Sequence, residues 1–432
     1  MKINVVGAGL AGCEAAWQIA CSGINVKLFE MKPKKFSPAH KSENFAELVC
    51  SNSFKASRID SASGLLKEEM RLLNSLLLQC AENCKVPAGG ALAVDREKFS
   101  EIVTEKIRSH ELIEVVNEEF TKIPEDEITI IATGPLTSDV LSEEIKNLTG
   151  DFLSFYDAAA PIVTKESIDM DEAFFASRYN KGEDNAYINC PLNKEQYERF
   201  YKALKEAERA PVHDFDVRDP KVYEGCMPVE VMAQRGEDTL RFGPMKPVGL
   251  IDPKTDSRPY AAVQLRAENK EGTLYNLVGF QTNLKFPEQR RVFGLIPALK
   301  NADFVRFGVM HRNTFLNSPQ ILNKDFSLKK NKNIFFAGQI TGVEGYMESA
   351  ASGILAGINA VRKIKTQESF ILPNETMLGA LSDYVSSSIS KNFQPMGANF
   401  GILPSLEVHI KDKKERYKTL ANRSIEALKS LI

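Results

Sequence analysis

Residues 1–30 read MKINVVGAGLAGCEAAWQIACSGINVKLFE, and this stretch decides the fold. Ile3–Val6 is a short apolar run that predicts a buried strand, and a helix with apolar periodicity extends to about Ser22, before Gly23. Asn25–Phe29 predicts a second strand, which ends at Glu30. A strand, a glycine-rich turn, a helix and a second strand form the βαβ unit that binds dinucleotides.

The turn of this unit carries the cofactor prediction. Its glycines allow a tight turn and a close approach of backbone N–H groups to a pyrophosphate at the helix N-terminus. Glu30 lies 18 residues after Gly12, about where an acid holds the ribose hydroxyls. The plainer alternative is a glycine-rich turn that only packs a helix on a sheet. The predicted cofactor-binding residues here are Gly7, Ala8, Gly9, Leu10, Ala11, Gly12 and Glu30.

Two later segments favour FAD over NAD as the tightly held cofactor. Residues 127–134 (EITIIATG) predict a buried strand that ends at Gly134. Residues 333–342 (NIFFAGQITG) predict another, with Gly338, Gln339 and Gly342 in its turn, and a helix of small residues follows from Glu348. A late return to the first domain is typical of FAD-dependent enzymes with two dinucleotide folds, whereas an NAD dehydrogenase needs none.

The sequence therefore predicts an α/β protein with a Rossmann-like FAD-binding domain of the glutathione-reductase type and an inserted α+β domain. We expect residues 1–135 and 326–432 to form the split FAD-binding domain, with a helical C-terminal tail. Residues 136–325 form the inserted domain in this prediction, for substrate or RNA.

The composition is that of an ordinary globular protein, with 432 residues, 43% apolar residues and 26% charged residues. No apolar run reaches the roughly 18 residues of a membrane span, and the start of the chain belongs to the fold instead of forming a signal peptide. The net charge of −2 gives no general attraction to nucleic acid, so RNA would need a local basic patch. Candidates for such contacts are Arg241, Arg266, Lys285, Arg290, Arg291 and the run 411–418.

Seven cysteines are present, and none forms a CxxC pair. This argues against a disulfide framework or a zinc site, so we expect no metal and a reduced, cytoplasmic location. Cys50 lies in the loop-like stretch ELVCSNSFKA, where a thiol is available for chemistry, although a free cysteine is most often a small buried hydrophobe. We expect that structural role for Cys13, Cys21, Cys80, Cys84 and Cys190.

Long motifs along nearly the whole chain resemble one family, the folate- and FAD-dependent tRNA uracil-5-methyltransferases called TrmFO. These motifs include FAELVCSNSFKA (45–56), YEGCMPVEVMAQRGEDTLRFGPMKPVGL (223–250), FGVMHRNTFLNSP (307–319) and FFAGQITGVEGYMESAASG (335–353). The related GidA/MnmG proteins share the flavin half but are longer. The resemblance implies C5 methylation of the T-loop uridine at tRNA position 54, with a methylene group from 5,10-methylenetetrahydrofolate and electrons from NADPH or NADH through FAD.

This chemistry needs a soft nucleophile that adds to C6 of uracil and a base that removes the C5 hydrogen. The resemblance places the family's two essential cysteines at Cys50 and Cys226, and we expect Cys226 to be the nucleophile and Cys50 the base or thiol partner. The reverse assignment stays open, and Lys55 or Arg58 could act on Cys50 if they point inward. The residues expected beside folate and substrate are His311, Arg312, Asn313 and Tyr346, with simple packing as the alternative role for Tyr346.

Three alternatives remain at this stage. The same chemistry could act on a uridine of 23S ribosomal RNA, which nothing in the sequence separates from tRNA. An FAD oxidoreductase acting on a small metabolite would need neither RNA nor the two cysteines. A flavin-bearing RNA-binding or RNA-folding module would bind RNA without methyl transfer. No second GxGxxG is present, so the nicotinamide cofactor is expected to bind transiently in the flavin cleft.

Overall fold

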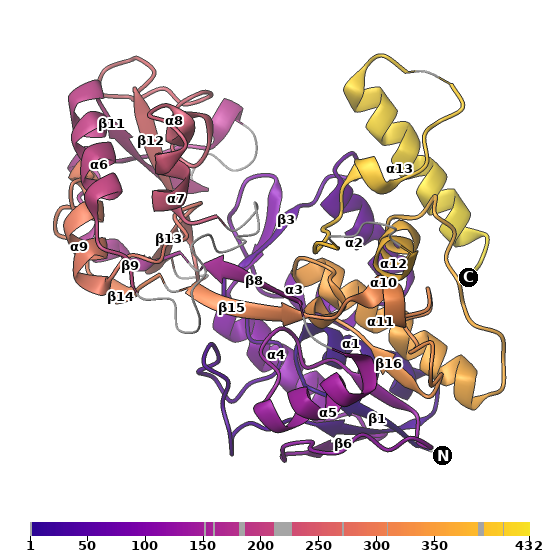
Figure 1. Cartoon of the computed structure of the whole chain (residues 1–432). Helices are drawn as coiled ribbons and strands as arrows, with labels where there is room; N and C mark the ends of the chain where they lie inside the picture. The colour runs from indigo at the N-terminus through magenta and orange to yellow at the C-terminus, as the bar shows by residue number, and fades with distance from the viewer. Residues whose placement is uncertain are drawn as a thin grey trace.

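The computed structural model describes residues 2–150, 153–158, 160–180, 186–210, 227–269, 272–308, 310–387, 393–408 and 410–432, with only the backbone of 153–158, 180 and 311–313. Two lobes are joined by a ribbon of two antiparallel strands, β8 (Leu153–Ala158) and β15 (Met310–Phe315) (Figure 1). None of the helices in the described ranges has the length and apolar character needed to cross a membrane.

The first lobe is built on a five-stranded parallel sheet with strand order β16-β7-β1-β2-β6. Its strands are β1 (Lys2–Val6), β2 (Asn25–Phe29), β6 (Ile113–Val116), β7 (Thr129–Ile131) and β16 (Ile334–Phe336). Parallel strands covered by helices are typical of the doubly wound α/β class, and β16 confirms the predicted late return of the chain. A small antiparallel sheet of β3 (Ser53–Ala56), β4 (Lys85–Val86) and β5 (Ala91–Val94) lies in the same lobe.

Helices surround this sheet. The predicted first helix is α1 (Leu10–Cys21), which packs closely against the late helix α11 (Tyr346–Ile364). The first lobe also contains α2 (Ala62–Leu72), α3 (Leu76–Glu82), α4 (Arg96–Arg108), α5 (Asp139–Thr149), α10 (Ser318–Ile321), α12 (Met377–Ser387) and α13 (Lys413–Lys429).

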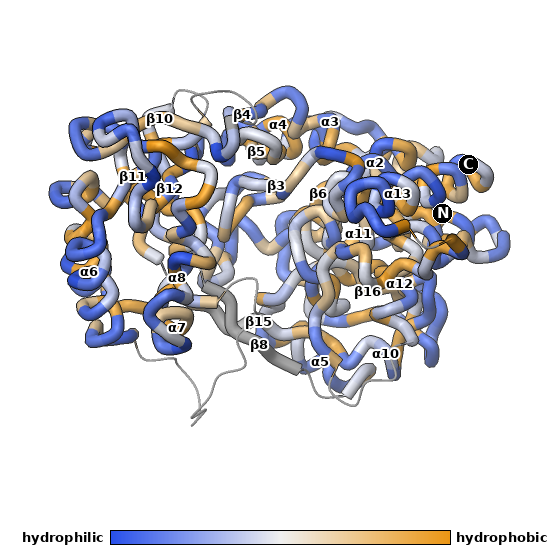
Figure 2. Tube along the Cα trace, turned by 90° about the horizontal axis from the view of Figure 1, so that it is seen from above, coloured by the Kyte–Doolittle hydropathy of each residue, from blue (hydrophilic) through white to orange (hydrophobic). Residues whose placement is uncertain are grey.

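The second lobe contains a six-stranded sheet with order β10-β11-β12-β13-β9-β14, whose pairings are antiparallel. The strands are β9 (Ile162–Thr164), β10 (Phe174–Phe175), β11 (Tyr187–Leu192), β12 (Ala261–Ala267), β13 (Leu274–Leu277) and β14 (Phe304–Arg306). Its helices are α6 (Lys194–Glu206), α7 (Val229–Gln234), α8 (Thr239–Phe242) and α9 (Phe286–Phe293). Figure 2 shows α6 and α13 as mostly hydrophilic helices on opposite lobes.

Two hydrophobic cores mark the lobes. One runs from Ile3 to Ile145 and resumes at Phe315, and the other runs from Val163 to Phe304. The expected boundaries at 135 and 325 therefore lie inside the first core, because α5 and the residues after β15 pack there. We propose instead that the lobes exchange at β8 and β15.

A buried carboxylate in the first lobe gives a pH prediction. Glu69 accepts hydrogen bonds from the backbone N–H groups of Met377 (2.6 Å) and Leu378 (2.8 Å) at the start of α12. Burial nevertheless raises the pKa of Glu69 to about 7 from 4.5. The contribution of Glu69 to stability is thus fully present below about pH 4.5 and is lost as the pH rises through 7. Chemical denaturation between about pH 5 and 8 should show Glu69→Gln gaining stability relative to wild type as the pH rises. A constant difference would contradict this prediction.

Candidate active site

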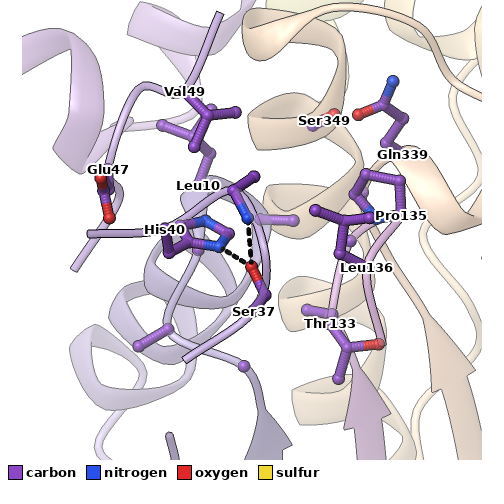
Figure 3. Close-up of a pocket in the computed structure, with 18 of the residues that line it drawn as sticks. Leu10, Ser37, His40, Glu47, Val49, Thr133, Pro135, Leu136, Gln339 and Ser349 are labelled. Carbon is purple, nitrogen blue, oxygen red and sulfur yellow. Dashed lines mark hydrogen bonds between the residues drawn. The ribbon is translucent and has the colours of Figure 1, made fainter. Parts of the chain in front are cut away.

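A cavity of about 430 Å³ lies where the carboxyl ends of β1, β2 and β7 meet the start of α1. Of the predicted cofactor-binding residues, those that line it are Gly7, Ala8, Gly9, Leu10, Ala11, Glu30, Gly134, Gly338 and Gln339. Figure 3 shows His40, Glu47 and Val49 on one side of the cavity and Thr133, Pro135 and Leu136 on the other. Cys50 and Tyr346 line the same cavity, so the structure brings the glycine turn and one of the two singled-out cysteines together.

The glycine turn fits a dinucleotide. A methyl group added at Gly9 would meet no atom within 4 Å, so this position leaves room for a ligand against the backbone. A methyl group at Gly12 would lie 1.8 Å from the Gly7 carbonyl oxygen, so Gly12 serves the packing of the turn and does not line the cavity. Gly342 does not line the cavity either. A methyl group at Gly342 would lie 2.6 Å from the Phe393 ring, so this glycine also serves packing.

Glu30 is held in place by backbone donors. Its carboxylate accepts hydrogen bonds from the N–H groups of Ala8 (2.9 Å) and Lys32 (3.0 Å), and it is only 8% exposed. A carboxylate has about four lone-pair sites, so it can still accept hydrogen bonds from ribose hydroxyls. The residues present therefore fit FAD.

The sequence interpretation missed His40, which lines the cavity. Its Nδ1 lies 2.5 Å from the Ser37 Oγ, and burial lowers the pKa of His40. Nothing in the local sequence marks this histidine, since only the folded chain brings residues 37–49 against the glycine turn.

The backbone of the loop that carries Cys50 is held by hydrogen bonds at Cys50 and at the residue that follows it. The Tyr346 hydroxyl oxygen accepts hydrogen bonds from the backbone N–H groups of Cys50 (2.7 Å) and Ser51 (3.1 Å). Burial raises the pKa of Tyr346, so this hydroxyl stays protonated at neutral pH. Tyr346 thus both lines the cavity and orients the main chain at Cys50.

Three arginines, which we call the arginine clamp, hold the same loop. Arg96 donates from Nη1 to the Leu48 carbonyl (2.6 Å), and Arg306 donates to the Val49 carbonyl. Arg266 donates to the Ser51 Oγ (2.8 Å) and the Asn52 Oδ1 (3.0 Å). Two of the three come from the second lobe, so the position of the Cys50 loop depends on both lobes.

The arginine clamp places positive charge beside Cys50. Glu268 pairs with Arg96 at 2.8 Å, which leaves an excess of cationic groups in the cluster. Burial lowers the pKa values of Arg266 and Arg306, and the nearby Cys50 is one of the groups that raise these two values. The cluster is therefore suited to a site where negative charge develops.

Of the two expected charge partners of Cys50, Lys55 lines the same cavity and donates to the buried Glu348 at 3.2 Å. Arg58 lies 3.2 Å from Asp60. Arg266, one of the plausible RNA contacts, is only 7% exposed, and its guanidinium donates to the Cys50 loop. Among the other basic candidates, Lys285 pairs with Glu208 and Arg291 with Glu288.

The remaining site candidates are described in part or not at all. Cys226 lies outside the described residues, as do the side chains of His311, Arg312 and Asn313, whose backbone lies in β15. Burial confirms a structural role for Cys13, Cys80, Cys84 and Cys190, whereas Cys21 is exposed at the end of α1. The described residues contain no cluster of His, Cys, Asp or Glu that could hold a metal ion.

Arg306→Met tests whether the arginine clamp positions Cys50. Loss of the donor to Val49 should lower kcat by about 10- to 100-fold, because small misplacements of reacting groups carry costs of this size. The KM for the RNA substrate that the sequence leads us to expect should change little. Arg58→Met is the matched control, since Arg58 is exposed and pairs locally. Steady-state kinetics on both variants decide the question, and an unchanged kcat in Arg306→Met would contradict it.

The parallel sheet, the glycine turn, Glu30 and the late return of the chain define an FAD-binding protein of the Rossmann-like class. The family model described as "Glucose inhibited division protein A" matches residues 2–368. A crystal structure of GidA from Aquifex aeolicus superimposes with a TM-score of 0.72 at 15% identity, covering 100% of this chain and 73% of that chain, which supports the fold.

Relatives of higher identity specify the family. The protein from Acetivibrio thermocellus named methylenetetrahydrofolate–tRNA-(uracil-5-)-methyltransferase TrmFO is 62% identical over 431 residues, which cover 100% of this chain and 98% of the relative. The protein of the same name from Staphylococcus aureus is 59% identical over 430 residues, with coverages of 99% and 98%. The chain belongs to the TrmFO family, whose flavin domain is related to GidA.

Proposed function

We propose that this protein methylates C5 of a uridine in tRNA, with FAD bound in the cavity and the one-carbon unit taken from 5,10-methylenetetrahydrofolate. The observation that carries the proposal is the position of Cys50 on the wall of a dinucleotide cavity, in a loop held by the arginine clamp and Tyr346. The names of the full-length relatives support the same reaction. The T-loop uridine is the proposed target within tRNA.

The glycine turn of residues 7–12 holds the pyrophosphate of FAD in this proposal, and Glu30 holds a ribose. Gly338 and Gln339 line the cavity beside Tyr346, the first residue of α11, and bind the flavin portion. Bound FAD supplies hydride-transfer chemistry, with NADPH or NADH as the electron donor.

The two cysteines carry out the steps at the base. Uracil C5 is a poor nucleophile until a thiolate adds to C6, which pushes electron density onto C5 and the C4 oxygen. We assign this addition to Cys226 and the removal of the C5 proton to Cys50. The described chain resumes at Met227, and the Val229 N–H donates to the Gln281 carbonyl at 2.7 Å. Because Gln281 lines the cavity, the described residues that follow Cys226 in sequence are anchored at the cavity wall.

The strand β15 supplies the proposed folate contacts His311, Arg312 and Asn313. This strand pairs with β8, and Thr314 donates through its N–H to the Pro135 carbonyl at 3.1 Å. Pro135 lines the cavity, which supports a location of β15 near the cofactor.

The direct test is incubation of the purified protein with unmodified tRNA, 5,10-methylenetetrahydrofolate and NADPH. Mass spectrometry of the nucleosides should detect 5-methyluridine, and digestion mapping should place it in the T loop. Omission of folate is the control and should leave the RNA unmodified. Oxidation of NADPH at the same rate without RNA, with no methylated nucleoside, would contradict the proposal and favour a small-metabolite oxidoreductase. Methylation of ribosomal RNA alone would correct the substrate.

A further inference from the structure

Gln281 lies in the turn between β13 and α9 of the second lobe and lines the cavity. Among the described residues of that lobe, it is the one that reaches the cavity wall. The other described lining residues belong to the first lobe, so Gln281 is placed to contact a ligand from the second lobe.

The backbone around Gln281 is held rigidly. Its carbonyl accepts the hydrogen bond from Val229, and its neighbours Phe280 and Thr282 are fully buried. The buried carboxylate of Glu230 accepts hydrogen bonds from the Thr282 hydroxyl (2.8 Å) and the Asn283 N–H (2.7 Å). The backbone that carries Gln281 is therefore fixed before a ligand arrives.

The side-chain amide of Gln281 forms no hydrogen bond within the described part of the chain. Gln339 differs from Gln281 in this respect. Its amide also lies at the cavity, but it donates to Glu344 at 2.8 Å. A half-buried amide that forms no hydrogen bond with the described residues offers one acceptor and two donors to a ligand.

We propose that Gln281 recognises the N3–H and C4=O edge of a pyrimidine-2,4-dione ring. The amide oxygen accepts from N3–H, and the amide N–H donates to the C4 oxygen, as a planar amide does when it pairs with two adjacent groups of a base. Uracil and the pyrimidine portion of the flavin both present this edge. For uracil, the inference rests on the proposed function, and the donor at C4=O would also stabilise negative charge that develops there after addition at C6.

The experiment uses Gln281→Leu, which removes both hydrogen bonds, and Gln281→Glu, which removes the donor. Gln234→Leu is the matched control, since Gln234 is exposed on α7 of the same lobe. FAD affinity and the visible flavin spectrum form one arm. The other arm measures kcat/KM on tRNA whose target is either uridine or 3-methyluridine, which lacks the N3–H.

If uracil is recognised, kcat/KM on the uridine substrate falls by about 10- to 100-fold in Gln281→Leu, while FAD binding stays as in wild type. The kcat/KM of wild type should fall by a similar factor when the target is 3-methyluridine instead of uridine. In Gln281→Leu the same change of target should have little further effect, because both changes remove the same contact. If the flavin is recognised, the FAD dissociation constant rises by a similar factor and the spectrum shifts.

Two results would overturn the inference. In the first, Gln281→Leu matches Gln234→Leu in both arms. In the second, FAD affinity and kcat/KM on tRNA both fall in Gln281→Leu, and its melting temperature is lowered enough to explain both losses. If wild type forms no 5-methyluridine, the proposed function fails, and the FAD arm alone then decides the role of Gln281.

Discussion

Exchange of Cys226 for alanine is expected to abolish covalent trapping of RNA that contains 5-fluorouridine, while FAD stays bound. A fluorine at C5 cannot leave as a proton, so the adduct between the nucleophile and C6 accumulates when the base-catalysed step is blocked. Cys50→Ala should keep trapping and lower methyl transfer by about 10²- to 10⁴-fold, the range for loss of a general base. Denaturing gel electrophoresis of the RNA adduct and nucleoside mass spectrometry measure the two effects.

Cys21→Ala is the control for this pair, because Cys21 is exposed on α1 and does not line the cavity. It should retain both trapping and turnover. Full trapping in Cys226→Ala, together with its loss in Cys50→Ala, would reverse the two assignments. Full methylation in both variants would remove the cysteines from the mechanism.

Gly353→Ala is expected to lower the free energy of unfolding by about 3 kcal/mol or more and to weaken FAD binding. A methyl group at Gly353 would lie 2.1 Å from the Ala11 carbonyl oxygen, which is backbone and cannot move aside alone. The helices α1 and α11 would have to separate, and Ala11 lines the cavity directly after Gly9 and Leu10. Displacement of α1 therefore carries the glycine turn with it.

Chemical denaturation and FAD titration measure these two effects. Gly90→Ala is the matched control, since a methyl group there meets no atom within 4 Å. It should leave both quantities unchanged. Normal FAD affinity in a stable Gly353→Ala protein would show that α1 and α11 tolerate separation without disturbing the glycine turn.

Much of the first lobe could be predicted from the sequence because its signals are local. The strand, turn and helix of residues 3–21 follow from apolar periodicity and glycine positions, and the strand Asn25–Phe29 is confirmed with the predicted bounds. The late strand and the helix of small residues were also predicted, and the small residues are explained by the close approach of α11 to α1. The predicted boundaries at 135 and 325 differ from the extent of the first core, because packing of α5 and of the segment after β15 into that core has no local signature.

The sequence by itself determined the class of cofactor and the family, since a glycine turn followed by an acid and long motifs around Cys50 are written in consecutive residues. The tertiary structure alone decided what surrounds Cys50 and which group faces the cavity from the second lobe. Arg96, Arg266 and Arg306 come from distant segments, and Arg266 is buried where a surface contact was expected. Gln281 stands out only because its amide is unpartnered among the described residues at the cavity wall. These features depend on which distant segments the two cores bring into contact, and a linear pattern does not contain that information.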